Sequence, residues 1–304
     1  MDFFALEYFI NPNKRIYWGF LLSSLVITFI YIYLKKDSNS KILFSSKLWW
    51  HPSARLDYSY FLISYFIKLF MIYPVVISAK TIALKVNYTM SEQFGYFFTN
   101  SFSYETIMIL YTITLFTVSD FTRYWTHRFL HTIPFLWHFH KVHHSAKVLN
   151  PLTFYRVHPI ENILFGFRYS ISIGLVTGVF IYFFGAMLSV YDIFGVNVFV
   201  FVFSLLGSNL RHSHVKFKYF SWCEKWLISP YMHQIHHSTK HLDRNYGGYL
   251  AIWDRVFNTL TLSNEVKNIK FGLRKEQMGD YDSLLKLIYT PFLTLIQRKK
   301  IWDI

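Results

Sequence analysis

Cysteine and charge are scarce in this chain of 304 residues. The single cysteine, Cys223, excludes an intramolecular disulfide, a cysteine-based zinc finger and a cysteine-ligated iron–sulfur cluster. Charged residues make up only 16% of the sequence, against 53% hydrophobic and 21% aromatic residues, which is too little charge for the surface of an ordinary soluble protein. A disordered chain is excluded as well, because there is ample apolar surface to bury.

Other familiar signals are also missing. The chain has no Gly-x-Gly-x-x-Gly fingerprint for a dinucleotide. Its first residues lack the basic start and small-residue cleavage site of a signal peptide, so we expect them to be retained. There is no internal repeat, low-complexity tract or flexible linker. We therefore expect residues 1–304 to form a single membrane domain.

The net charge of +14 raises the question of nucleic acid. The basic residues, however, lie in short clusters beside apolar runs, such as Lys14-Arg15 and Lys35-Lys36. Membrane proteins carry positive charge in this way on the cytoplasmic side. We therefore expect no nucleic-acid partner.

Several apolar runs approach the length that a bilayer requires, about 20 residues. They cover about 17–34, 58–79, 107–122, 163–188 and 191–206, and the last two are close enough to form a helical hairpin. The sequence thus predicts an all-α integral membrane protein with about four to five transmembrane helices. A cytoplasmic, helical, histidine-rich region is expected to bind metal.

The distribution of basic residues predicts the orientation. They concentrate in 35–55 and in 123–156, whereas the stretch after the second run holds only Lys80 and Lys85. The positive-inside bias places the two basic stretches, and everything after Leu206, in the cytoplasm. The N-terminus would then face the other side. The protein is expected to be a multi-pass membrane protein with its histidine motifs on the cytoplasmic side.

Histidine is abundant, with fourteen residues in the chain. His127 and His131 form H-x-x-x-H, and the motif H-x-x-H-H occurs twice, at 140–144 and at 233–237. Residues at i, i+3 and i+4 share one face of a helix, so each motif directs its imidazoles toward one point. Adjacent histidines diverge by about 100° on a helix, which suits two neighbouring metal ions better than one.

Four interpretations compete at this stage: buried polar histidines, a single zinc ion, two metal ions and a bis-histidine haem. Isolated histidines are usually buried polar residues, but eight in three spaced motifs point to metal, and more of them than a single zinc ion needs. Two metal ions with about five nitrogens each fit better, although imidazole suits iron, zinc, copper and nickel alike. Bis-histidine haem would require isolated histidines inside facing membrane helices, and these motifs lie at and beyond the ends of the apolar runs.

At these motifs the sequence resembles the fatty acid hydroxylase and sterol desaturase superfamily of integral-membrane di-iron oxygenases. The resemblance covers roughly residues 120–261, which would be the catalytic region. The text that carries it includes His127-Arg128-Phe129-Leu130-His131, Trp137-His138-Phe139-His140-Lys141-Val142-His143-His144-Ser145, Tyr155-Arg156-Val157-His158-Pro159, Asn209-Leu210-Arg211-His212, Met232-His233-Gln234-Ile235-His236-His237 and Asp243-Arg244-Asn245-Tyr246-Gly247.

The resemblance implies which residues hold two iron ions. The expected ligands are His127, His131, His140, His143, His144, His212, His214, His233, His236 and His237, with His214 the less certain of the pair between the motifs. Asp120, Tyr124, His158 and His241 are expected to support the ligands. Asp120 and Tyr124 share a helix face with His127, but Asp120 is equally explained as a helix-end charge paired with an arginine. Asp243 and Asp254 either orient histidines or make turn contacts.

The implied activity is hydroxylation or desaturation of an unactivated C–H bond of a lipid taken from the bilayer, with O₂ as co-substrate. Electrons would come from a separate reductase, ferredoxin or cytochrome. Two alternatives remain open from the residues alone, a non-catalytic metal-binding membrane protein and a metal-dependent membrane hydrolase. The choice of lipid, and of hydroxylation against desaturation, is also open.

Overall fold

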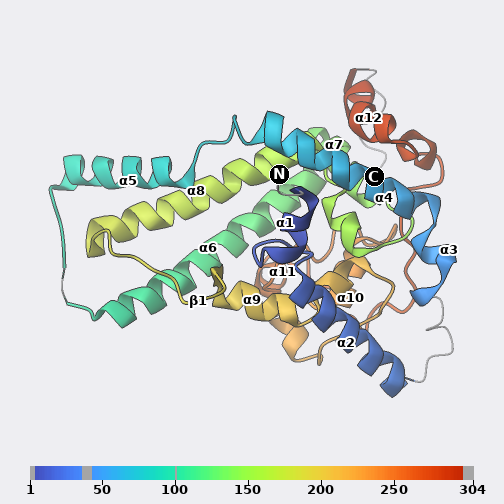
Figure 1. The fold of residues 1–304 in the computed structure, drawn as a ribbon, viewed down its shortest axis with the longest axis horizontal. Helices are drawn as coiled ribbons and strands as arrows, with labels where there is room; N and C mark the ends of the chain where they lie inside the picture. Colours follow the sequence, from blue (N-terminus) through green and yellow to red (C-terminus); the bar gives the residue numbers. More distant parts are fainter. Residues whose placement is uncertain (1–3, 36–42, 100, 297–304) are drawn as a thin grey trace.

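The computed structural model describes residues 4–35, 43–99 and 101–296, and helices dominate them (Figure 1). The expectation of a mostly helical chain is confirmed. The longer elements are α1 (Phe4–Ile10), α2 (Trp18–Lys35), α4 (Pro52–Ile67), α5 (Ala79–Phe94), α6 (Tyr104–Thr132), α7 (Pro134–His144), α8 (Pro159–Phe184), α9 (Val198–Leu205), α10 (Pro230–His236) and α12 (Leu284–Ile296). The short elements are α3 (Ser46–Trp49), the π-helix η2 (Lys68–Ile72), the 3₁₀-helices η3 (Pro151–Tyr155), η4 (Ser208–His212), η5 (Cys223–Lys225) and η6 (Met278–Tyr281), α11 (Ile252–Val256), and the antiparallel strands β1 (Asp192–Ile193) and β2 (Val196–Asn197).

Three helices form an arm that extends to one side of the molecule (Figure 1). Within this arm α8 packs against both α5 and α6. Two glycines allow the close approach of α5, because a Cβ at Gly174 would lie 2.8 Å from the carbonyl oxygen of Ala79 and one at Gly178 would lie 2.6 Å from that of Ala83. Small residues at this spacing are typical of closely packed membrane helices.

The other half of the molecule, which we call the histidine half, gathers the short helices α7, α10, η3 and η4 beside α4 and α12 (Figure 1). A buried ion pair joins its parts: Arg156 Nε lies 2.5 Å from Asp57 Oδ1 on α4. The second oxygen of Asp57 accepts hydrogen bonds from Asn150 and Thr153. This network fixes the segment between α7 and α8, because a buried carboxylate needs all its partners.

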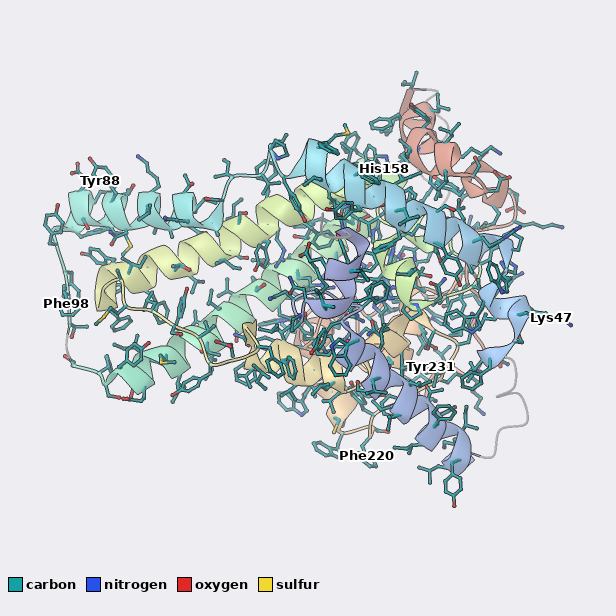
Figure 2. All side chains as sticks on the ribbon, in the orientation of Figure 1. Lys47, Tyr88, Phe98, His158, Phe220 and Tyr231 are labelled. Carbon is teal, nitrogen blue, oxygen red and sulfur yellow. The ribbon has the colours of Figure 1, made fainter. Side chains whose placement is uncertain are left out.

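Two of the described helices, α2 and α8, have both the length and the apolar composition that a membrane crossing requires. Large apolar side chains are exposed along the molecule, including Tyr88 and Phe98 at the far end of the arm (Figure 2). The expected total of four to five spans stays a prediction.

The fifth predicted span is wrong. Within 191–206 the chain forms the β1–β2 hairpin and then α9, whose eight residues extend only about 12 Å, well short of a bilayer core. The turn explains the difference: Phe194 and Gly195 have positive φ, and Asp192 Oδ1 accepts a hydrogen bond from the Gly195 N–H. The helical hairpin expected at 189–190 is therefore absent from these described residues.

The second predicted span, 58–79, is not one helix. Regular structure stops at Ile72 after α4 and η2, and a new helix, α5, starts at Ala79. α4 packs against η3 in the histidine half, and it is α5 that runs along α8 in the arm.

The expectation that the N-terminus and residues 123–156 lie on opposite sides of the membrane is also wrong. Tyr8 of α1 and Tyr155 of η3 were expected on opposite sides of the bilayer, yet their ring centroids lie 5.3 Å apart within one buried cluster. A hydrocarbon core of about 30 Å cannot separate residues in contact. The residues before α2 therefore lie on the same side as η3.

Candidate metal centre

Nine of the ten expected ligands come together in the histidine half. Five form one group and four form a second, and the candidate ligand atoms within each group lie within 4.8 Å of one another. The first group consists of His127, His131, His140, His144 and His236, and the second of His143, His212, His233 and His237.

Short helices produce this arrangement. α7 and α10 both begin with proline, which favours the first helical position, and both end in an H-x-x-H-H motif. Adjacent histidines belong to different groups, as the angle of about 100° between successive helical residues predicts. His143 and His144 have ring centroids 5.6 Å apart and lie one in each group. The pair at 236 and 237 does the same, at 5.5 Å.

In the four-membered group the Nε2 atoms face one another. His212 Nε2 lies 3.3 Å from that of His143, 3.1 Å from that of His237 and 3.3 Å from that of His233. Two nitrogens bound to one ion at about 2.0–2.1 Å would be about 2.8–3.4 Å apart at octahedral or tetrahedral angles. The spacing of these lone pairs therefore fits a shared metal ion.

Backbone carbonyl oxygens contact the Nδ1 atoms of several of these imidazole rings. His127 Nδ1 donates to the carbonyl oxygen of Tyr246 at 2.8 Å, and His236 Nδ1 donates to that of Arg244 at 2.7 Å. His143 Nδ1 lies 3.3 Å from the carbonyl oxygen of Arg156, which the Asp57 network fixes. Such contacts leave Nε2 as the free lone pair and set the ring orientation.

Burial keeps these imidazoles neutral. Removal from water lowers the pKa of His140 to about 3 and that of His143 to about 4. The pKa values of the other seven lie well below the ordinary range, because burial and neighbouring histidines both oppose a positive charge. Neutral imidazole is the form that binds metal.

The five-membered group contains buried nitrogens that lack a hydrogen-bond partner among the described residues. These include Nε2 of His131 and Nε2 of His236. A buried polar atom without a partner is costly, and metal coordination would satisfy both. The donor set, nine neutral imidazoles in two groups, thus fits two metal ions.

Glu161 is a polar neighbour that the sequence did not single out. It lies in the first turn of α8, and its Oε1 is 3.0 Å from His140 Nδ1, with both side chains only 2% exposed. A carboxylate behind a ligating histidine orients the ring and raises its basicity. The signal was present as His158-Pro159-Ile160-Glu161, but a first-turn acid is usually explained by the helix dipole.

His214 lies outside both groups. Its Nε2 accepts a hydrogen bond from the Leu149 N–H at 3.2 Å, so the lone pair that a metal would need is already engaged. The expectation that His214 is a ligand is corrected accordingly. His212, two residues earlier, lies in the four-membered group.

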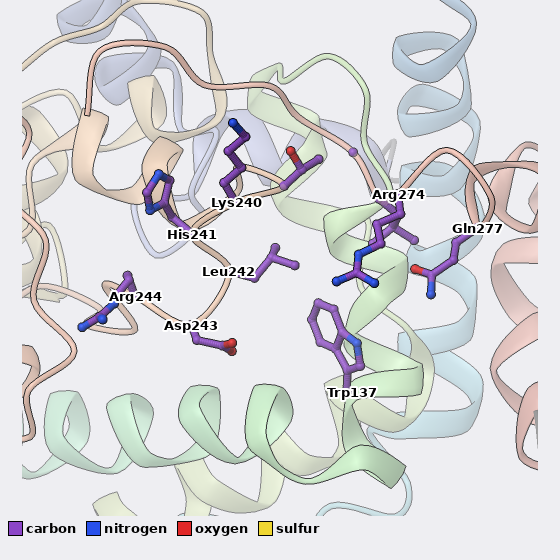
Figure 3. A pocket seen from close by; sticks show the side chains of 11 residues that line it. Trp137, Lys240, His241, Leu242, Asp243, Arg244, Arg274 and Gln277 are labelled. Carbon is purple, nitrogen blue, oxygen red and sulfur yellow. The ribbon is translucent and has the colours of Figure 1, made fainter. Parts of the chain in front are cut away.

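His158 and His241 do not support the ligands in the expected way. His158 caps α8, accepting from the Ile160 N–H through Nδ1, while its Nε2 donates to the Ile288 carbonyl oxygen. His241 lines a separate cavity of about 410 Å³ beside Trp137, with Lys240, Arg244 and Arg274 around it (Figure 3).

Asp120 and Tyr124 connect α6 to the segment after α10. Asp120 accepts hydrogen bonds from the Tyr249 and Leu250 N–H groups and from Trp253 Nε1. Neither the expected histidine nor an arginine is its hydrogen-bond partner. The Tyr124 hydroxyl lies 3.0 Å from Thr259 Oγ1. Asp120 thus positions backbone, and Tyr124 binds another side chain rather than an imidazole.

Asp243 and Asp254 act on the same segment. Asp254 accepts from the N–H groups of Tyr246 and Gly247, which are turn contacts that also fix the carbonyl above His127. Asp243 Oδ1 accepts from the Tyr246 hydroxyl and lies 3.8 Å from His131 Nδ1.

A cavity of about 270 Å³, the inner cavity, opens onto both groups. Five candidate ligands line it, and they are His127, His140, His143, His212 and His233. Glu161 and several basic residues complete its wall. Space for a small part of a substrate therefore exists directly beside the candidate metal positions.

Comparison with known proteins gives a consistent result. Residues 112–259 match the family model described as Fatty acid hydroxylase. The alkylglycerol monooxygenase of Danio rerio is 29% identical over 188 residues, which are 61% of this chain and 37% of that protein. The alkylglycerol monooxygenase of Homo sapiens is 28% identical over 156 residues, 51% of this chain and 31% of the relative.

A bacterial protein matches the same way: ornithine lipid hydroxylase OlsE of Rhizobium tropici is 28% identical over 145 residues, 47% of this chain and 39% of its own length. The chain thus spans about a third of the length of the curated relatives it matches. No solved structure matches it.

Proposed function

Because the chain belongs to the fatty acid hydroxylase superfamily, we propose that it is a membrane-bound di-iron oxygenase that hydroxylates a C–H bond of a lipid with O₂. The family match and the relatives confirm the resemblance found in the sequence. The iron, the lipid and the reaction at this site are the proposal.

One observation carries it: nine neutral imidazoles, most of them buried, form two adjacent groups, and five of the nine line one cavity. Iron in these groups supplies the chemistry that activates dioxygen. The residues of the chain hold the ions, position the lipid carbon beside them and exclude water. Tyr246, Arg244 and Arg156 contribute the carbonyls that keep His127, His236 and His143 in place.

Electrons have to come from elsewhere. The sequence contains no dinucleotide fingerprint and no cysteine set for a ferredoxin cluster. We therefore propose a separate reductase, ferredoxin or cytochrome as the donor.

The test measures metal and oxygen together. Detergent-purified protein, loaded with ferrous iron and supplied with a reductant, is expected to hold about two irons per chain and to consume oxygen when lipid is added. His143→Ala should lose iron and lipid-dependent oxygen uptake, because His143 belongs to the four-membered group.

His214→Ala is the matched control, since His214 is a neighbouring histidine outside both groups and should leave iron content unchanged. Stoichiometric zinc without oxygen uptake, despite iron and reductant, would refute the oxygenase and favour a hydrolase or a non-catalytic metal protein.

A further inference from the structure

Five basic side chains surround the inner cavity. They are Arg15, Lys68, Arg123, Arg168 and Arg211, and they come from elements far apart in the sequence. Among the described residues, Glu161 is the only acid on the same wall, and Asp120 is close enough to Arg123 for their charges to interact. Positive charge therefore exceeds negative charge around this cavity even if both acids are ionised.

None of the five has a carboxylate partner among the ion pairs of residues 4–35, 43–99 and 101–296. Arg15 and Arg211 donate instead to backbone carbonyls, of Ser208 and of Gly248 and Ile228. Arg123 and Lys68 stack over the rings of Tyr249 and Tyr155. Arg211 is buried and the other four are half-buried, and a cation removed from water without counter-charge is costly unless an anion joins it.

Two of the guanidinium groups retain unused donors. Nε of Arg168 and Nε of Arg211 are buried and have no hydrogen-bond partner in the described part of the chain. Arg211 is only 2% exposed, so bulk water does not satisfy its Nε. Guanidinium groups with free N–H donors recognise phosphate and carboxylate oxygens.

A second cavity of about 460 Å³, the outer cavity, continues from this charged wall. The two cavities share Arg15, Arg123, Arg168 and Phe154. Elsewhere the outer cavity is lined mainly by apolar side chains of α2, α6, α8 and α9, which include Phe20, Leu115, Phe116, Ile173 and Val200. Five polar side chains also line it, and they are Asn13, Lys14, Ser119, Asn197 and Ser204. Charged groups at the boundary and a mainly apolar chamber beyond it fit an amphipathic molecule rather than a free anion.

The distance of Arg168 from the far end of the arm also fits an amphipathic ligand. Arg168 precedes the end of α8 at Phe184 by about 24 Å, and no charged residue lies between them. The hydrocarbon core of a bilayer is about 30 Å thick. With the arm in the membrane, Arg168 would lie near the level of lipid headgroups.

We propose that Arg15, Arg123 and Arg168 bind the anionic headgroup of a lipid substrate, a phosphate or a carboxylate, while its apolar chain occupies the outer cavity. This assignment rests on the proposed lipid hydroxylase and names its substrate class. Arg211 adds its unused Nε donor from the inner side.

Binding of defined probes to the iron-loaded protein in a neutral detergent tests the assignment. Hexadecyl phosphate and hexadecanol differ only in the anionic group, and inorganic phosphate has the same group without a chain. Hexadecyl phosphate is expected to bind about tenfold or more tightly than hexadecanol, because charge-assisted hydrogen bonds are gained. It should also bind far more tightly than inorganic phosphate, because the chain is buried.

Arg123→Gln and Arg168→Gln are each expected to reduce the preference for hexadecyl phosphate by about tenfold. Arg168→Lys should keep most of it. Arg55→Gln removes the same charge from an exposed position on α4 and should change nothing. The iron content of every variant shows whether the histidine half is still folded.

Equal affinity of the wild type for hexadecyl phosphate and hexadecanol would overturn the proposal, and so would arginine variants that keep the preference. Inorganic phosphate that binds as tightly as hexadecyl phosphate would indicate a site for free anions instead. Oxygen uptake with neutral lipids and no preference for the anion would refute the headgroup site and leave the lipid hydroxylase standing. A preference for hexadecyl phosphate without lipid-dependent oxygen uptake would refute the hydroxylase and leave the headgroup site standing.

Discussion

Glu161 is buried against His140, and no other acidic side chain of the described residues lines the inner cavity. We expect Glu161→Ala to weaken iron binding by about 10–100-fold, because the ring of His140 loses the group that orients it. Glu161→Gln should lose less, since the amide oxygen can still accept from Nδ1. The measurement is iron content after dialysis against a graded series of chelator concentrations.

Glu265→Ala provides the control, because Glu265 is an exposed acid far from the candidate ligands in sequence. Iron retention by Glu161→Ala equal to that of Glu265→Ala would mean that the carboxylate does not position His140. A uniform loss of folded protein, seen as aggregation on a sizing column, would be distinguished from selective loss of metal.

At the residue scale the sequence was informative where helical spacing alone decides the outcome. The i, i+3, i+4 pattern predicted both the convergence of α7 and α10 and the division of His143 from His144. It had no means of separating His212 from His214, because neither lies in an α-helix and the Leu149 amide that engages His214 is distant in sequence. The placement of Asp120 under the Tyr249 and Leu250 amides was unpredictable for the same reason.

At the scale of elements, apolar runs predicted α2, α6 and α8 but misjudged their neighbours. Mean hydropathy carries no information about turns. The apolar run 191–206 was therefore predicted to be a helix, although Asp192 and Gly195 form the turn of a hairpin. α5 was missed because it carries Lys80 and Lys85, and its place in the arm depends on contact with α8.

The contact between α5 and α8 gives a prediction about Gly178. A Cβ there would lie 2.6 Å from both the Ala83 carbonyl oxygen and Val86 Cβ, so Gly178→Leu forces the two helices apart. We expect a loss of about 1–3 kcal/mol in stability, typical of overpacking. The measurement is the thermal unfolding midpoint in detergent.

Gly279→Leu is the matched substitution, because a Cβ at Gly279 meets nothing within 4 Å. It should leave the midpoint close to that of the wild type. An unchanged midpoint in Gly178→Leu would show that α5 and α8 do not depend on this contact.

For the whole molecule, the arm and the histidine half suggest one arrangement in the membrane. From Tyr104 to Ser119, α6 carries a single charged residue, Glu105, at its far end, and the candidate ligands follow within the next turns. The stretch from Tyr104 to His127 is about 35 Å long, slightly more than a bilayer core. With the far end of the arm at one surface, both histidine groups would lie at the other, where a lipid headgroup can reach them.

The lone cysteine makes this arrangement testable. Cys223 lies in η5 of the histidine half, and basic residues around the motifs predict the cytoplasmic side. A membrane-impermeant maleimide should label it in inside-out vesicles and not in right-side-out ones. Tyr96, at the far end of the arm, is 98% exposed, so Cys223→Ser combined with Tyr96→Cys should reverse the pattern. Labelling of both positions from the same side would mean that the arm does not cross the bilayer, and lipid would then have to reach the outer cavity from a single leaflet surface.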